Sequence, residues 1–98
     1  MQVTVHVPAS LRQYSGGAGK LQVEVVESAT LNALFDCLHE RYPGIVERAL
    51  DESGSVRQHV NVFVDGESIR AGSSLGLATP VRAGTEVWIL PAVSGGLG

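Results

Sequence analysis

Apolar and polar residues alternate with a period of two in several short segments, which is typical of strands with one buried face. The segments run over residues 2–7, 21–27, 60–64 and 86–90. Their predicted inward sets include Val3, Val5 and Val7, then Leu21, Val23 and Val25, then Val60, Val62 and Val64. The glycine-rich residues 15–19 predict a hairpin loop, and Asp65-Gly66 predicts a tight turn followed by a short return strand over residues 67–70.

One segment changes to a helical period. Its apolar stripe recurs at i, i+3, i+4, i+7 and i+11 and consists of Leu31, Leu34, Phe35, Leu38 and Tyr42. Thr30 is the expected N-cap, and Pro43-Gly44 is expected to end the helix before a short second helical piece over residues 45–50.

The order of these elements predicts an α+β fold in which one main helix covers a mixed sheet of four to five strands. If the N-terminal hairpin pairs with the final strand at the sheet centre, the result is a β-grasp (ubiquitin-like) fold.

Composition narrows the class of protein. The chain has 98 residues and a net charge of −3, which predicts one domain and no basic footprint for nucleic acid or an anionic membrane. No apolar stretch approaches the roughly 20 residues of a membrane helix, and the N-terminus lacks a cationic secretory region. One cysteine suits a reducing compartment. We therefore expect a cytoplasmic protein, with a domain over residues 1–92 and a flexible C-terminal tail over residues 93–98.

The body of the chain offers no convincing catalytic constellation. His6, His39 and His59 have no recognised metal-ligand spacing, so we expect no metal site. Cys37 lies off the helical stripe without a partner that would activate it, and we interpret it as passive. Three acidic residues near the second helical piece are expected to be solvated: Glu47, Asp51 and Glu52. No concave pocket is expected on so small a sheet.

The tail after Leu90-Pro91 has two interpretations. It can be a frayed terminus, which composition alone favours. It can also be a threaded substrate, because Gly95 and Gly96 lack a Cβ atom and fit a channel too narrow for other residues. Residues 91–96 can extend about 20 Å, enough to reach a buried site in a partner enzyme.

Two segments resemble the MoaD/ThiS family of ubiquitin-like sulfur carriers. Residues 83–96, AGTEVWILPAVSGG, are similar to the family's turn, strand and Leu-Pro…Gly-Gly ending. Residues 60–70, VNVFVDGESIR, resemble its central hairpin. The resemblance covers about residues 1–96. The length and the insertion at residues 53–58 are most similar to the CysO-like carriers.

The resemblance implies that the chain is a protein cosubstrate and not an enzyme, with no catalytic residue and no bound cofactor of its own. An E1-like adenylating enzyme would use ATP to activate the carboxylate of Gly96, and a sulfur donor would convert it to a thiocarboxylate. A sulfur-accepting biosynthetic enzyme would then use the sulfur to make cysteine, molybdopterin, thiamin or a sulfur-containing natural product. Ser94 and Gly95 would thread into the partner. Leu97 and Gly98 would form an extension that a JAMM-type metalloprotease removes; direct use of the Gly98 carboxylate is the alternative that stays open.

Two alternatives remain open at this point. The chain can be a ubiquitin-like modifier whose glycine forms isopeptide bonds with lysines, or a non-covalent β-grasp interaction module. We expect the E1-like enzyme to dock on the sheet face away from the helix, near the tail, because it must hold the domain while the tail threads. The candidate docking residues are Phe63 and Val26, with Arg70 at the polar rim.

Overall fold

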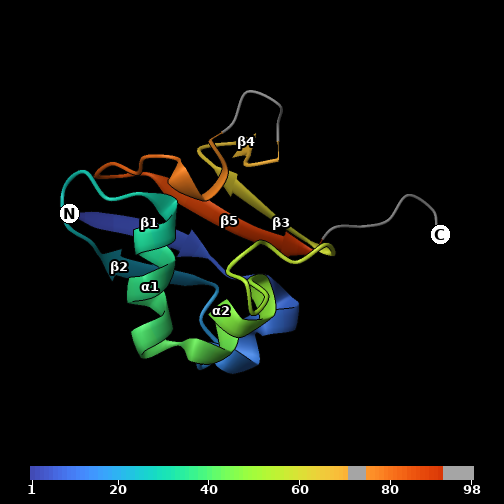
Figure 1. Cartoon of the computed structure of the whole chain (residues 1–98). Coiled ribbons are helices and arrows are strands. Elements are labelled where there is room, and N and C mark those ends of the chain that lie inside the picture. Colours follow the sequence, from blue (N-terminus) through green and yellow to red (C-terminus); the bar gives the residue numbers. More distant parts are fainter. Residues whose placement is uncertain (71–74, 92–98) are drawn as a thin grey trace.

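Five strands form one mixed sheet in the computed structural model, which describes residues 1–70 and 75–91 (Figure 1). Its strands are β1 (Gln2–His6), β2 (Lys20–Glu24), β3 (Val60–Val64), β4 (Glu67–Ser68) and β5 (Glu86–Pro91), in the spatial order β2-β1-β5-β3-β4. The central pair, β1 and β5, is parallel, and the other pairs are antiparallel. The N-terminal hairpin thus pairs with the last strand at the sheet centre, which confirms the β-grasp fold.

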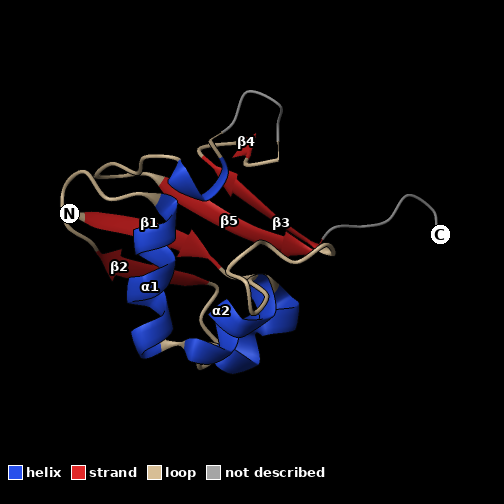
Figure 2. Ribbon diagram, in the orientation of Figure 1, coloured by secondary structure: helices blue, strands red, loops and turns tan. Residues whose placement is uncertain are grey.

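Two α-helices cover one face of the sheet (Figure 2). Helix α1 spans Leu31–Arg41, and the Thr30 hydroxyl caps it by accepting the Ala33 N–H at 3.3 Å. Pro43 ends α1, as expected, but it is also the first residue of α2 (Pro43–Ala49), where a missing N–H has no cost. The second helical piece therefore begins two residues earlier than the sequence suggested.

The core lies between this face and the helices. The alternating valines of β1 and the stripe of α1 are buried as predicted, except that Tyr42 is only half buried. The largest fully buried side chains are Phe35, Leu31, Leu34, Leu38, Ile45, Ile89, Val3, Val5, Val62, Val81 and Val87. Within the described ranges, no helix is long and apolar enough to cross a membrane.

The glycine-rich residues 15–19 lie in turns and bends between the antiparallel strands β1 and β2, as expected. The same connection also contains a 3-10 helix, η1 (Ala9–Tyr14), that the sequence did not predict. Two strand ends differ from the prediction. Strand β2 ends at Glu24 and not at residue 27. Strand β5 extends one residue beyond the predicted end at residue 90, to Pro91, because a missing N–H is tolerated at the end of a strand.

Helix η1 is held against α2 by a close approach of Tyr14 to Gly44. A Cβ atom on Gly44 would lie 2.7 Å from Tyr14 Cδ1, so only glycine fits there without a shift. The Arg48 guanidinium also lies over the Tyr14 ring, 3.9 Å from its centroid. The connection from β4 to β5 contains a second 3-10 helix, η2 (Gly76–Ala78).

Candidate functional site

The predicted tail begins where the central strand ends. Strand β5 is paired on both sides, with β1 and with β3, and its last residues Leu90 and Pro91 lie opposite Asn61 and Val60. The tail residues Ser94, Gly95, Gly96, Leu97 and Gly98, and the boundary at residue 92, lie outside the described residues. We call the end of β5 at Leu90-Pro91 the tail root.

The sheet face opposite the helices carries an in-register row across all five strands. Register pairs link Lys20 to His6, His6 to Trp88, Trp88 to Phe63 and Phe63 to Ser68. The rings of His6 and Trp88 stack with centroids 3.6 Å apart and an interplanar angle of 3°. Trp88 nevertheless remains 40% exposed. An aromatic surface that is open to a partner therefore lies on the strand that leads into the tail.

A carboxylate fixes the His6 ring in this stack. His6 Nε2 donates to Glu86 Oε1 at 2.6 Å, from the preceding same-face position of β5. His6 is buried although it lies on the face away from the helices, since the indole of Trp88 covers it. The sequence placed His6 on this face but gave no sign of its two partners.

The structure separates the three residues predicted to form a docking patch. Phe63 pairs with Trp88 and lies on the open face, as expected. Val26 is 75% exposed, but it follows β2 at the end of the sheet where β1 begins, because Val25 donates its N–H to the Met1 carbonyl. Since β1 and β5 are parallel, Val26 lies at the opposite end from the tail root, and its expected position near the tail is wrong.

Arg70 lies at the tail end of β3. Its guanidinium donates to Asn61 Oδ1 at 3.2 Å and also to the carbonyl oxygens of Gln58 and Arg57. Asn61 pairs with Leu90, so Arg70 borders the open face beside the tail root. This matches its predicted place at the rim.

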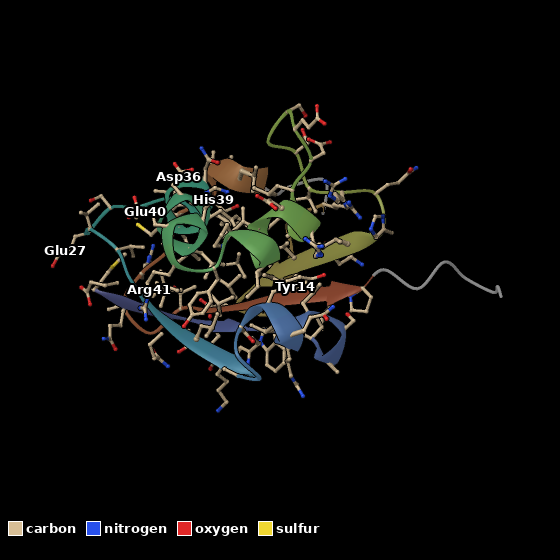
Figure 3. The ribbon with its side chains drawn as sticks, turned by 90° about the horizontal axis from the view of Figure 1, so that it is seen from below. Tyr14, Glu27, Asp36, His39, Glu40 and Arg41 are labelled. Carbon is tan, nitrogen blue, oxygen red and sulfur yellow. The ribbon has the colours of Figure 1, made fainter. Side chains whose placement is uncertain are left out.

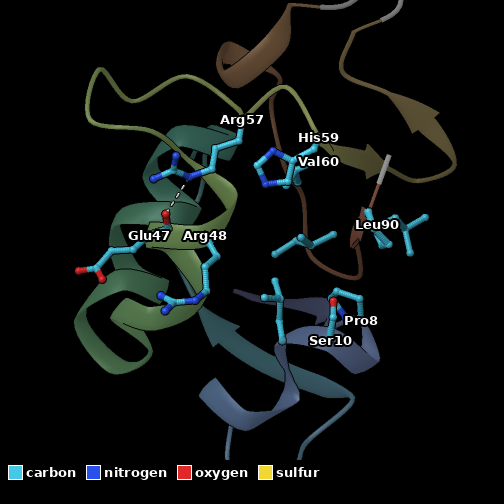
Figure 4. Close-up of a pocket in the computed structure, with 11 residues that line it drawn as sticks. Pro8, Ser10, Glu47, Arg48, Arg57, His59, Val60 and Leu90 are labelled. Atoms are coloured by element: carbon cyan, nitrogen blue, oxygen red, sulfur yellow. Dashed lines mark hydrogen bonds between the residues drawn. The ribbon is translucent and has the colours of Figure 1, made fainter. Parts of the chain in front are cut away.

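Two hollows flank the tail root, although the sequence predicted no concave pocket. The larger, of about 550 Å³, lies between η1, α2 and the ends of β3 and β5 (Figure 4). The smaller, of about 310 Å³, lies beside His6 and Trp88. Both are lined by Pro8, Ile89 and Leu90. Side chains far apart in sequence form these hollows, and no local pattern announces them.

The other candidates behave as structural groups. Cys37 is half buried against the core. Residues 1–70 and 75–91 hold no cluster of three metal-ligating side chains. Asp51 lies in the turn after α2 and accepts hydrogen bonds from the hydroxyl and N–H of Ser53 and from the Ser55 N–H. These hydrogen bonds lower the pKa of Asp51 below its ordinary value of 3.8, and the Ser53 hydroxyl has the largest effect. The charge of Arg57 lowers the pKa further by a smaller amount.

The sequence profile of the ThiS family matches residues 5–96. The chain belongs to the ThiS family. This ThiS family protein is 40% identical to the sulfur carrier protein CysO of Mycobacterium tuberculosis over 98 residues, which cover 98% of this chain and all of the relative. The expected membership in the MoaD/ThiS carriers, with CysO-like character, is confirmed.

Solved structures agree with the fold of this ThiS family protein. CysO in the BexX/CysO complex of Amycolatopsis orientalis matches with a TM-score of 0.80 and 34% identity, over 96% of this chain and 99% of that one. SAMP1 of Haloferax volcanii matches with a TM-score of 0.78 and 27% identity, over 98% of this chain and all of that one. The ThiS family fold thus extends over the whole described body.

Proposed function

We propose that this ThiS family protein is a sulfur carrier whose C-terminal glycine, Gly96, holds sulfur as a thiocarboxylate. The observation that carries the proposal is the position of the tail root. The Leu-Pro…Gly-Gly segment continues from the central strand β5, beside an open aromatic face of Trp88 and Phe63. A partner that grips this face can receive the tail that follows it.

The chemistry requires activation because a carboxylate is a poor electrophile. A carboxylate oxygen of Gly96 attacks the α-phosphorus of ATP on an E1-like enzyme, and pyrophosphate leaves. Hydrosulfide then attacks the acyl carbon, AMP leaves, and loss of a proton gives the thiocarboxylate. In these steps the folded body of the chain is the surface that the partner binds, and the tail carries the reacting carboxylate. ATP belongs to the activating partner, and this chain needs no cofactor of its own.

The sulfur is then passed to a biosynthetic enzyme. A CysO chain in complex with BexX gives a structural precedent for association of a similar carrier with a second protein. The relatedness to CysO favours an acceptor in cysteine synthesis, with molybdopterin, thiamin and sulfur-containing natural products as other destinations. Removal of Leu97 and Gly98 by a JAMM-type metalloprotease precedes activation.

The test uses a chain ending at Gly96, incubated with an E1-like enzyme, ATP and sulfide. Intact mass spectrometry should show the increase expected for replacing one oxygen by sulfur, and omission of ATP should abolish it. A Gly96→Ala form of the same chain should react poorly, because a Cβ atom enters the channel. If the otherwise unsubstituted chain ending at Gly96 stays unmodified with an enzyme that is active on another carrier, the proposal is contradicted.

A second function has one specific observation in its favour. The chain is 34% identical over 80 residues to small archaeal modifier protein 1 of Haloferax volcanii, covering 82% of this chain and 85% of that relative. A modifier would use the same activated glycine to form isopeptide bonds with lysines. Conjugates of higher mass on a denaturing gel would distinguish this outcome from a thiocarboxylate on the free chain.

A further inference from the structure

The two hollows at the tail root carry an unexpected concentration of positive charge. Arg48 and Arg57 line the larger hollow, and Arg12 and Lys20 line the smaller one. These are four of the seven lysine and arginine side chains of the chain. We call these four residues the basic collar. The collar surrounds the point where β5 ends in a protein whose net charge is −3.

Three collar arginines are held in place by groups that do not neutralise them. Arg12 Nε donates to the Val7 carbonyl at 3.2 Å, and Arg57 Nε donates to the Glu47 carbonyl at 3.0 Å (Figure 4). Arg48 stacks on the ring of Tyr14. In the part of the chain that the structure describes, no arginine forms an ion pair with a carboxylate. The three collar arginines are therefore oriented without being neutralised by an ion pair among the described residues.

Three carboxylates lie near the collar. Glu47 lines the larger hollow, but its carboxylate lies 3.9 Å from His39 Nε2, on the side of α1. Asp51 accepts hydrogen bonds from Ser53 and Ser55 and also offsets part of the charge of Arg57. Glu52 lines a third hollow together with Arg57, so Arg57 is the least available charge of the collar. Figure 3 shows other acidic side chains, Glu27, Asp36 and Glu40, on the side away from the end of β5.

The acidic ends of the strands also lie away from the collar. Glu86 opens β5 at the end opposite the tail root, and Asp65 lies beside it, since its N–H donates to the Glu86 carbonyl. Glu24 pairs with the N-terminus at the same end of the sheet. The tail end of the sheet therefore holds most of the basic side chains, while these strand-end carboxylates lie at the other end together with Arg82 and the N-terminal ammonium.

We propose that the basic collar docks acidic side chains on the rim of the protein site that receives the tail. The proposal rests on the proposed function, because only an inserted tail brings such a rim to the collar. A protein rim fits better than a small anion, since the charges lie in two hollows on either side of Leu90 and one small anion reaches only one of them. Opposite charges across the contact would speed encounter and orient the tail.

The charge attraction falls with added salt, because the Debye length shortens from about 30 Å at 0.01 M to about 8 Å at 0.15 M ionic strength. The first test therefore titrates the full chain with hexaglutamate at low salt and follows amide and arginine Nε signals by NMR. Saturable shifts should appear at Arg12, Lys20, Arg48 and Arg57, and hexaglutamine should cause none. Equal shifts at Arg41 and Arg82, or the same collar shifts with inorganic phosphate at equal concentration, would overturn the proposal.

The second test uses the chain ending at Gly96 and an E1-like enzyme. Lys20→Glu and Arg12→Glu should each raise KM by about tenfold at low salt with kcat nearly unchanged, and the difference should shrink at high salt. Arg82→Glu, at the other end of the sheet, is the matched control and should leave KM unchanged. Lys20 is exposed, so its substitution should leave the fold intact.

The two proposals fail in different ways. If the unsubstituted chain ending at Gly96 gains no sulfur at all, the carrier function fails, and the hexaglutamate titration still decides whether the collar binds acidic groups. If that chain is sulfurated while its Lys20→Glu, Arg12→Glu and Arg82→Glu variants share its KM, the collar proposal is overturned and the carrier function stands.

Discussion

The imidazole of His6 lies flat on the indole of Trp88, with ring centroids 3.6 Å apart. The two residues are 82 positions apart in the chain (88 − 6) but are direct register partners in the parallel pair β1–β5. The Glu86 carboxylate accepts a hydrogen bond from Nε2 of the same imidazole. The stack therefore joins the first strand to the strand that leads into the tail.

The stack should contribute measurable coupling energy. In a double-mutant cycle of His6→Ala and Trp88→Ala, we expect the two losses of unfolding free energy to be non-additive by about 0.5–1.5 kcal/mol, as for other stacked ring pairs. Urea unfolding followed by circular dichroism measures all four proteins. Strictly additive losses would show that the stack has no energetic role.

The same row of residues predicts where the activating enzyme docks. Trp88→Ala and Phe63→Ala should slow thiocarboxylate formation by raising KM, because both residues contribute to the open aromatic face beside the tail root. Arg70→Glu should slow it more than it changes stability.

Val26 offers a matched control for this surface. Val26→Ala also removes an exposed apolar side chain, but at the opposite end of the sheet, so its KM should equal that of the wild type. Steady-state kinetics on chains ending at Gly96 give the comparison. An effect of Val26→Ala as large as that of Phe63→Ala would place the docking surface elsewhere.

The hydrophobic periodicity of the sequence correctly predicted which faces of β1 and α1 are buried. The alternating valines of β1 and the stripe from Leu31 to Leu38 specify which face is buried, whatever the neighbours are. It could not predict which strand residues face one another, because register depends on long-range pairing. His6 has two partners that only the β1–β5 register brings near, and no local signal exists for either.

The tail root illustrates the same limit. Net charge averages over the chain, so it concealed the cluster of Arg12, Lys20, Arg48 and Arg57 around one end of the molecule. Helix η1 was also missed. Its position depends on the contact of Tyr14 with Gly44, residues on separate elements that local propensity does not connect.

The buried stripe of α1 predicts a large effect of truncation. Leu38 is almost completely buried, so Leu38→Ala should lower the unfolding free energy by about 2–5 kcal/mol through lost contacts and a new cavity. Glu40→Ala, two positions away on the exposed side of the same helix, should change it by less than about 0.5 kcal/mol. Equal thermal midpoints for Leu38→Ala and the wild type would contradict the helix register.

The turn after α2 predicts a pH-dependent contribution to stability. Because the folded pKa of Asp51 is lowered below 3.8, its charged form is favoured in the folded state. The stabilisation is present above that ordinary value and is lost as the pH falls through the lower folded pKa. The loss of stability in Asp51→Asn, measured by urea unfolding, should therefore shrink between about pH 5 and about pH 2. A constant difference over this range would contradict the assigned hydrogen bonds.

The sharpest prediction concerns Leu97 and Gly98. Adenylation needs a free carboxylate, and in a chain that continues to Leu97 the carbonyl of Gly96 is part of an amide. The full-length chain should therefore be inert with the activating enzyme, ATP and sulfide, while the chain ending at Gly96 gains sulfur. Treatment of the full-length chain with a JAMM-type metalloprotease should release the dipeptide Leu-Gly and restore activity. Intact mass spectrometry separates these outcomes, because a thiocarboxylate formed directly at Gly98 would overturn the need for processing while leaving the carrier function standing.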